Sequence, residues 1–428
     1  MATVVTSDYS SASVISERLN AVIEKLQQKT KSDVDIGELQ TALALMIRFV
    51  TTNPSFIQLK LKNMEEFMSE NEKAANDEIA MLLSPWLDLA NLAYEEETKS
   101  VEAKLSELGY TLINHSKDVD ATIVGHYLAF HPKKKEFLIG VKGTSSMEDV
   151  MTDVLAVTIP HKCLPHDPFT KSGLGSGFDL FTKSEEGTKI GAHEGILAAA
   201  LNLKEKIAPF VENLFIPLGY DVKIVGHSLG AGVSSLLAIL LRAQFVQLHG
   251  RLHAYCFATP PVLDIGSAKK AREFVTTVAN RSDCVVRMSL GNAEVLIRTL
   301  EALHPIMERE GMTNFWNLAH HQAFGAPQDE EFTEEEFGMF VKIVEEAQDA
   351  VDPTKSENLF APGKIIALYG TIDEAPSEGE DMKVAVKAVE VDNDHKFMRY
   401  IDINGNMVSD HLIDAYTNSL TACLETTE

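Results

Sequence analysis

Apolar residues recur every three or four positions through the first 85 residues, and this spacing predicts amphipathic helices. In the stretch 14–27, one helical face collects Val14, Ile15, Leu19, Val22, Ile23 and Leu26. The stretches 36–50, 59–71 and 76–92 continue the pattern. No residue in this part has the setting of a catalytic group, so we expect residues 1–85 to form a helical N-terminal extension of a main domain.

Short apolar runs that predict strands alternate with helical segments in the rest of the chain. The predicted strands are 121–130, 136–142, 221–225, 252–258, 274–279, 364–370 and 397–403, and helices are predicted at 192–207 and 233–245. Such alternation favours a mostly parallel sheet covered by helices on both faces. We therefore predict an α/β domain over residues 86–428.

Two long stretches interrupt this alternation. Residues 146–191 mix Pro, Gly and apolar side chains, and residues 290–362 hold two long helical patterns. In enzymes, insertions of this kind form lids and walls of the access path. We expect 146–191 to be a lid region and 290–362 to be a mostly helical insertion. For the second stretch, ordinary surface elaboration is an equally good explanation.

The most specific motif is VKIVGHSLGAG at 222–232, in which a strand pattern, a G-x-S-x-G turn and a helix pattern follow one another. This order is typical of a nucleophile elbow, a tight turn that exposes a serine hydroxyl above the start of a helix. Gly226 and Gly230 stand where such a turn leaves no room for side chains. Ser228 is therefore the candidate nucleophile.

An activated serine needs an acid and a base, which follow it along the chain in this type of hydrolase. Asp283, in the polar turn NRSDCVVRM after the strand 274–279, is the preferred acid, and Asp264 after the strand 252–258 is its main rival. His411 lies on a loop after the last predicted strand and is the preferred base. The other later histidines are placed less well, within the insertion or before a strand: His304, His320, His321 and His395.

Stabilising the oxyanion of an ester intermediate requires two backbone donors. One is expected at the amide of Leu229, directly after the nucleophile. The second is expected at Thr144, because the turn that follows the strand 136–142 begins with Gly143 and leads its amide inward. This chemistry uses no metal or organic cofactor.

The charge of the chain limits its partners. It carries 63 acidic against 38 basic residues, a formal net charge of −25, which argues against nucleic acid as a partner. Neither a secretory signal nor an apolar run long enough to span a bilayer is evident. We therefore expect a cytoplasmic protein, with peripheral contact to a membrane or lipid-droplet surface allowed, and four reduced cysteines.

Several motifs together resemble those of class 3 (fungal-type) lipases, most closely the diacylglycerol lipase-like branch. They are GHSLGAG, GVKGTSSMEDVMTDV, AHEGIL, NRSDCVVR, LFAPGKI and SDHLIDAY, spread over residues 87–420. The resemblance implies an α/β-hydrolase fold and the triad Ser228, Asp283 and His411. It also implies Thr144 and Leu229 at the oxyanion hole and His193 as structural support near the site. The chain departs from the family pattern at Lys142, where arginine is usual, and at Val286, where proline is usual.

The sequence thus predicts a serine hydrolase that cleaves carboxylic esters of acylglycerols through an acyl-enzyme. One alternative is a phospholipase A1 or galactolipase that uses the same triad. The other is a lipase-like scaffold without catalysis, with the N-terminal helices as its binding module. A scaffold has no need of all three triad residues, which favours an enzyme.

Overall fold

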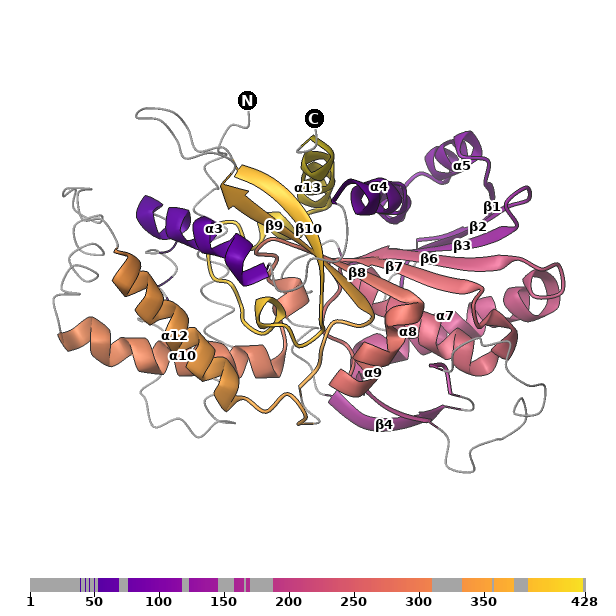
Figure 1. Ribbon diagram of the computed structural model, residues 1–428. Helices are drawn as coiled ribbons and strands as arrows, with labels where there is room; N and C mark the ends of the chain where they lie inside the picture. The colour runs from indigo at the N-terminus through magenta and orange to yellow at the C-terminus, as the bar shows by residue number, and fades with distance from the viewer. Residues whose placement is uncertain are drawn as a thin grey trace.

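An eight-stranded sheet between two layers of helices forms the centre of the molecule (Figure 1). The computed structural model describes residues 39, 43, 46, 50, 53–68, 76–117, 123–144, 158–164, 167–169, 188–309, 333–355, 358–372 and 384–425. The sheet strands are β1 (Thr111–Ser116), β2 (His126–His131), β3 (Glu136–Val141), β6 (Asp221–His227), β7 (Leu252–Phe257), β8 (Val275–Asn280), β9 (Lys364–Ile372) and β10 (Val384–Val391).

The sheet is parallel in its middle and antiparallel at both edges. Its strands follow the order β1-β2-β3-β6-β7-β8-β9-β10, and those from β3 to β9 run parallel to one another. β1 and β2 add to one edge and β10 to the other, each antiparallel to its neighbour. This arrangement confirms the predicted α/β-hydrolase fold with a mostly parallel sheet. It also brings the carboxyl ends of β3, β6 and β8 to one edge, where candidate residues follow each strand.

Helices cover both faces of the sheet (Figure 1). The layer of α7 (Glu194–Phe210), α8 (Leu229–Gln244) and α9 (Ile265–Lys270) lies on one face, and α4 (Asn76–Leu92) and α13 (Ile413–Glu425) lie on the other. Side chains of a strand point alternately to the two sides. Accordingly, Val222 and Ile224 of β6 join the core under α7 and α8, whereas Val225 joins the core under α4 and α13. No helix in the described ranges is both long and apolar enough to cross a membrane.

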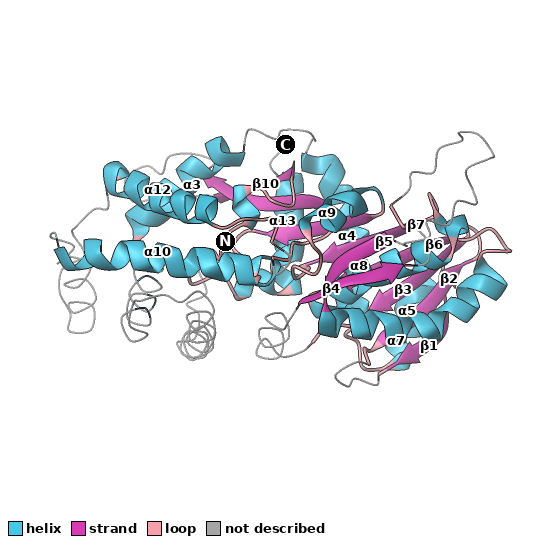
Figure 2. Ribbon diagram, turned by 90° about the horizontal axis from the view of Figure 1, so that it is seen from below, coloured by secondary structure: helices cyan, strands magenta, loops and turns pink. Residues whose placement is uncertain are grey.

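A third core lies beside the sheet and combines segments that are distant in sequence. α3 (Pro54–Met68), α10 (Leu290–Arg309) and α12 (Glu334–Ala350) contribute to it, and α10 and α12 lie side by side (Figures 1 and 2). α10 and α12 both lie within the predicted insertion 290–362, before the chain returns to β9. The domain boundaries stay a prediction.

Most of the predicted lid region lies outside the described residues. From it the structure describes β4 (Thr158–Leu164), residues 167–169 and the start of β5 (Thr188–His193), which pairs antiparallel with β4. A short helix, α5 (Thr98–Glu107), packs near the β1 edge. Three cysteines, Cys256, Cys284 and Cys423, are buried.

One predicted strand is wrong. Residues 397–403 hold part of a short 3₁₀ turn, Lys396–Met398, and an irregular segment, and the strand at this edge of the sheet is β10, which pairs antiparallel with β9. Phe397, Ile401 and Ile403 are buried all the same. The apolar run therefore signalled burial and not pairing, because a segment that packs beneath helices shows the same composition as a short strand.

Candidate active site

Ser228 occupies a strained turn between β6 and α8. Its φ is 60° and its ψ is −132°, a backbone conformation that only glycine adopts easily. The turn is held on both sides, since the Ser228 amide donates to the carbonyl of Phe257 at 2.9 Å and the Ser228 carbonyl accepts from the amide of Ala231 at 2.9 Å. Strain that the surrounding structure maintains is typical of a functional residue.

The two glycines of the motif are required by close backbone contacts. A Cβ on Gly226 would lie 2.5 Å from the carbonyl oxygen of Gly230. A Cβ on Gly230 would lie 2.5 Å from the carbonyl oxygen of Val141, at the end of β3. The turn therefore packs directly against its own helix and against the neighbouring strand, as a nucleophile elbow does.

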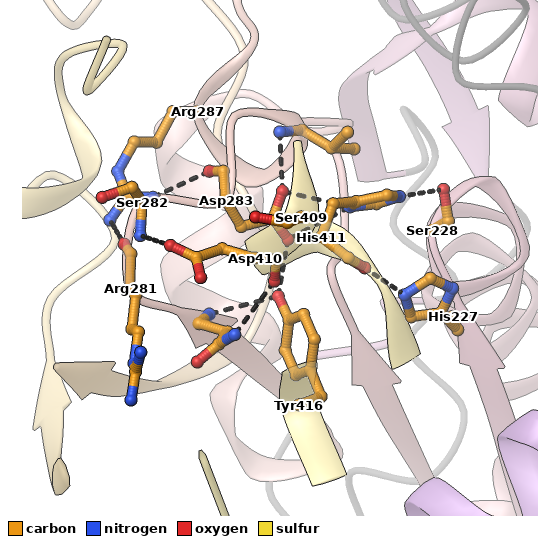
Figure 3. A network of polar contacts seen from close by, with 12 residues as sticks. His227, Ser228, Arg281, Ser282, Asp283, Arg287, Ser409, Asp410, His411 and Tyr416 are labelled. Carbon is orange, nitrogen blue, oxygen red and sulfur yellow. Dashed lines mark hydrogen bonds and ion pairs between the residues drawn. The ribbon is translucent and has the colours of Figure 1, made fainter. Parts of the chain in front are cut away.

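The structure brings together Ser228, His411 and Asp283, which are far apart in sequence (Figure 3). His411 Nδ1 lies 3.0 Å from Asp283 Oδ1, and His411 Nε2 lies 2.9 Å from Ser228 Oγ. An ionised carboxylate only accepts hydrogen bonds, so Nδ1 carries the proton and Nε2 is free to accept the proton of the serine hydroxyl. All three residues are buried. The arrangement can therefore activate a serine for acyl transfer.

Asp283 is fully buried and yet held in its charged form. Burial opposes ionisation, but the charge of His411 and hydrogen bonds from His411, Tyr416 and the Val285 amide together lower the pKa of Asp283 below its usual value. The Tyr416 hydroxyl donates to Oδ2 at 2.6 Å and the Val285 amide to Oδ1 at 2.8 Å. An ionised Asp283 is what an imidazolium at His411 needs for stabilisation.

His411 is also held through its backbone, by a residue next to the nucleophile. His227 Nε2 lies 2.8 Å from the His411 carbonyl oxygen, and its Nδ1 lies 3.0 Å from the hydroxyl of Tyr94. Burial and the nearby His411 lower the pKa of His227 to about 3, so this imidazole is neutral. It then donates to the carbonyl from Nε2 and accepts the Tyr94 hydroxyl proton at Nδ1.

Sequence reasoning missed His227, Tyr94 and Tyr416. The motifs GHSLG and SDHLIDAY contain two of them, but nothing in their spacing says that one touches the histidine and the other the acid. Nothing in the sequence around Tyr94, which follows α4, points to a contact with the candidate site. Their importance arises from contacts between distant elements.

The predicted oxyanion residues lie on either side of the nucleophile. Leu229 is the first residue of α8, and Thr144 follows Gly143 just beyond β3. At Gly143, an added Cβ would lie 3.3 Å from Ser228 Cβ and 2.5 Å from the His227 carbonyl oxygen. The loop after β3 thus passes directly over the elbow, although the role of both amides stays a prediction.

Asp264, the rival acid, is engaged elsewhere. It caps α9, with its carboxylate accepting hydrogen bonds from the Ser267 amide at 2.9 Å, the Ser267 hydroxyl at 2.7 Å and the Gly191 amide at 2.7 Å. His395 and His193 likewise act as helix caps, accepting from the amides of Phe397 and Ile196. The side chains of His304, His320 and His321 lie outside the described residues.

Asp264→Ala is expected to lower stability without lowering the rate of reaction at Ser228. Loss of a helix N-cap costs about 0.5–2 kcal/mol, and the link to Gly191 of β5 is lost in addition. The free energy of unfolding in urea and the rate of labelling by a fluorophosphonate would measure the two effects. A folded variant that reacts at least 100-fold more slowly would favour Asp264 as the acid.

Asp410 precedes His411 and is a buried acid with an unusual pKa. Burial raises the pKa of Asp410 to about 6, although Arg281 and a hydrogen bond from the Ser282 amide act in the opposite direction. Between the usual value of 3.8 and about 6, the folded state binds more protons than the unfolded state. The contribution of Asp410 to stability is therefore complete below pH 3.8 and is lost as the pH rises to about 6.

We expect Asp410→Asn to remove the loss of stability that the wild type shows as the pH rises to about 6. The variant should be more stable than the wild type by about 1–2 kcal/mol at pH 8, because asparagine carries no charge to bury. The difference should shrink towards pH 4.5, where Asp410 is already protonated in the folded protein. Urea unfolding at the two pH values measures it, and a difference that does not change with pH would contradict the raised pKa.

Comparisons with known proteins find relatives for part of the chain. The lipase (class 3) family model matches residues 138–293, a segment that contains Ser228 and Asp283 but not His411. Human diacylglycerol lipase-alpha is 30% identical over 185 residues, or 41% of this chain and 15% of the relative. Mouse diacylglycerol lipase-beta is 28% identical over 172 residues, which are 39% of this chain and 22% of the relative. The chain thus spans less than a quarter of the length of these relatives.

Solved structures show a more distant likeness. The Lip2 lipase from Yarrowia lipolytica is 20% identical, with a TM-score of 0.35 over 49% of this chain and 74% of that one. The Rhizomucor miehei lipase in complex with its propeptide is 15% identical, with a TM-score of 0.43 over 81% and 82%. Likeness at this level says nothing about the substrate. Over residues 138–293 the chain is similar to class 3 lipases, and diacylglycerol lipases are among its relatives.

Proposed function

We propose that this chain is a serine hydrolase that cleaves carboxylic ester bonds of acylglycerols through an acyl-enzyme intermediate. The observation that carries the proposal is the Ser228–His411–Asp283 chain of hydrogen bonds, at 2.9 and 3.0 Å, on a strained elbow. A merely structural serine has no need of a backbone conformation that costs about 1–3 kcal/mol. Catalysis gives that strain a purpose, since it presents Oγ to a substrate.

In this mechanism His411 Nε2 takes the proton of the Ser228 hydroxyl as Oγ attacks the ester carbonyl carbon. The Leu229 and Thr144 amides donate to the oxyanion of the tetrahedral intermediate. His411 then gives the proton to the leaving alcohol, and an acyl group remains on Ser228. Water repeats the sequence with His411 as base, which releases the fatty acid. Asp283 stabilises the imidazolium in both halves.

An acylglycerol substrate is favoured because diacylglycerol lipases are among the relatives of this chain. We also propose, as the setting for this reaction, a cytoplasmic protein that meets its substrate at a membrane or lipid-droplet surface. Leu412 supports such contact, since this large apolar side chain is 56% exposed directly after His411.

The test is hydrolysis by the purified chain of diacylglycerol, a phospholipid and a galactolipid in matched mixed micelles, with released fatty acid as the readout. A fluorophosphonate, which labels activated serines, is titrated in parallel. We expect the fluorophosphonate to label the protein and fatty acid to be released fastest from diacylglycerol. The rate of fatty acid release should fall in proportion to the fraction of protein labelled. Labelling with faster release from phospholipid or galactolipid would indicate the other ester class. Absence of both labelling and release would leave the scaffold alternative.

A further inference from the structure

α3 and the residues before it lie N-terminal to the segment that matches the lipase family and share an apolar core with both loops of the candidate triad. Apolar residues at Leu39, Leu43, Met46, Val50 and Phe56 share one core with two other groups. The first group is Cys284, Val285 and Met288, directly after Asp283. The second is Ile401, Ile403 and Met407, on the loop that leads to His411. Apolar residues between Leu39 and Phe56 are therefore part of the same buried cluster as the loop after Asp283 and the loop before His411.

α3 also has a fixed position on the sheet. Gly370 of β9 leaves room for it, since a Cβ there would lie 3.2 Å from the Leu61 side chain. The contacts of α3 with β9 and α12 can be followed in Figure 1. A helix seated in this way is a rigid base for a polar side chain that reaches towards the loops.

Lys60 is that side chain. Its Nζ lies 2.6 and 2.5 Å from the two carboxylate oxygens of Asp402, and the two side chains are only 20% and 11% exposed. Asp402 Oδ2 in turn accepts a hydrogen bond from the Ser282 hydroxyl at 2.6 Å. Ser282 is the residue before Asp283. An ion pair from the N-terminal segment therefore reaches the acid turn through one carboxylate.

The turn that holds Asp283 is also hydrogen-bonded to the residue before His411 (Figure 3). The Ser282 amide donates to Asp410 Oδ2 at 3.2 Å, and Asn280 Nδ2 donates to the Asp410 carbonyl oxygen at 2.9 Å. Asp410 is the residue before His411. Ser282 is thus bonded to Asp402 by its side chain and to Asp410 by its backbone, so a shift of Asp402 moves the neighbours of both Asp283 and His411.

A buried carboxylate cannot easily move away from its cation or lose it. Burial opposes ionisation of Asp402, but Lys60, Arg287 and the Ser282 hydroxyl lower its pKa below the usual value. Removing Lys60 leaves Asp402 with less compensation, so the loop 401–408 is expected to shift towards solvent. Triad chemistry is sensitive to such shifts, because a misplacement of about 1 Å costs on the order of 100-fold in rate.

We propose that Lys60 is a positioning residue for the triad, acting through Asp402 and Ser282 on the spacing of Asp283 and His411. The inference rests on the proposed serine hydrolase function, which it deepens by giving the N-terminal helix a part in catalysis. Lys60 touches no reacting atom. Its contribution is to hold the acid turn and the base loop in the register that places His411 Nε2 against Ser228.

Labelling by a fluorophosphonate separates positioning from folding. The end point counts correctly folded sites, and the rate constant reports the reactivity of Ser228 in those sites. For Lys60→Met we expect a full end point per folded molecule and a rate constant lowered about 10-fold or more. Lys60→Arg, which can keep the ion pair, should stay within about threefold of the wild type.

Lys62→Met is the matched control on the same helix. Lys62 pairs with Glu334 at 2.7 Å, but both side chains are well exposed, and among the described residues no ion pair joins them to the triad loops. An exposed pair of this kind contributes little. The Lys62→Met rate constant should therefore equal that of the wild type within about twofold.

A double variant covers the case in which Lys60→Met folds poorly. Lys60→Met with Asp402→Asn removes the uncompensated charge but still lets residue 402 accept from Ser282, so stability should recover while labelling stays slow. The proposal is overturned if Lys60→Met labels at the wild-type rate, or if the double variant recovers the full rate together with stability. An unlabelled wild type would instead refute the proposed function itself.

Discussion

Ser228→Ala is expected to lower ester hydrolysis by about 10⁴–10⁶-fold and to abolish fluorophosphonate labelling. The substitution removes the only atom that forms the acyl-enzyme, and nucleophile deletions in serine hydrolases have effects of this size. His411 and Asp283 keep their contact, so the fold should remain. Fatty acid release from diacylglycerol and the extent of labelling are the measurements.

Ser228→Gly is the informative companion of that variant. It is equally unable to form an acyl-enzyme, but glycine adopts a φ of 60° with a ψ of −132° without strain. We therefore expect it to exceed Ser228→Ala in unfolding free energy by about 1 kcal/mol. Equal stability of the two variants would mean that the elbow stores no strain, and labelling of either one would mean that another residue is the nucleophile.

The parts of the fold that sequence predicts well are those that depend on local pattern. The elbow is the best example, because the strand, the two glycines and the helix all lie within 222–232. The segment 397–403 shows where local pattern fails. Its apolar residues are buried beneath helices, and a short buried run looks the same whether it pairs or not.

The candidate triad could be predicted because chain order restricts the choices. Strand-end reasoning leaves two acids, and the polar turn NRSDCVVRM favours Asp283 without excluding Asp264. What separates them is tertiary: Asp264 bonds to its own helix and to Gly191, whereas Asp283 meets His411 and Tyr416. Tyr94, just after α4, and Lys60, on α3, lie far from the motif in sequence, so no spacing rule could have pointed to their contacts.

Asp283→Asn is expected to lower kcat by about 10³–10⁴-fold with little change in KM. The carboxylate accepts from His411 Nδ1, Tyr416 and the Val285 amide, whereas an amide presents one accepting and one donating atom. Asparagine also supplies no charge to stabilise the imidazolium that forms when Ser228 is deprotonated. Steady-state hydrolysis of a short-chain ester at pH 8 and the rate of fluorophosphonate labelling should fall together.

Tyr416→Phe separates the charge of Asp283 from its placement. This variant removes the hydrogen bond of 2.6 Å to Oδ2, and the Asn280 amide loses an acceptor, but the carboxylate and its contact with His411 remain. A loss of about 10-fold is expected, since one hydrogen bond to a charged group contributes on the order of 1.5–3 kcal/mol and the turn around Asn280 absorbs part of it. If Asp283→Asn lowers kcat no more than Tyr416→Phe does, then the charge of Asp283 adds nothing to catalysis beyond its position. The acid role would then have to be abandoned, because stabilising an imidazolium requires the charge itself.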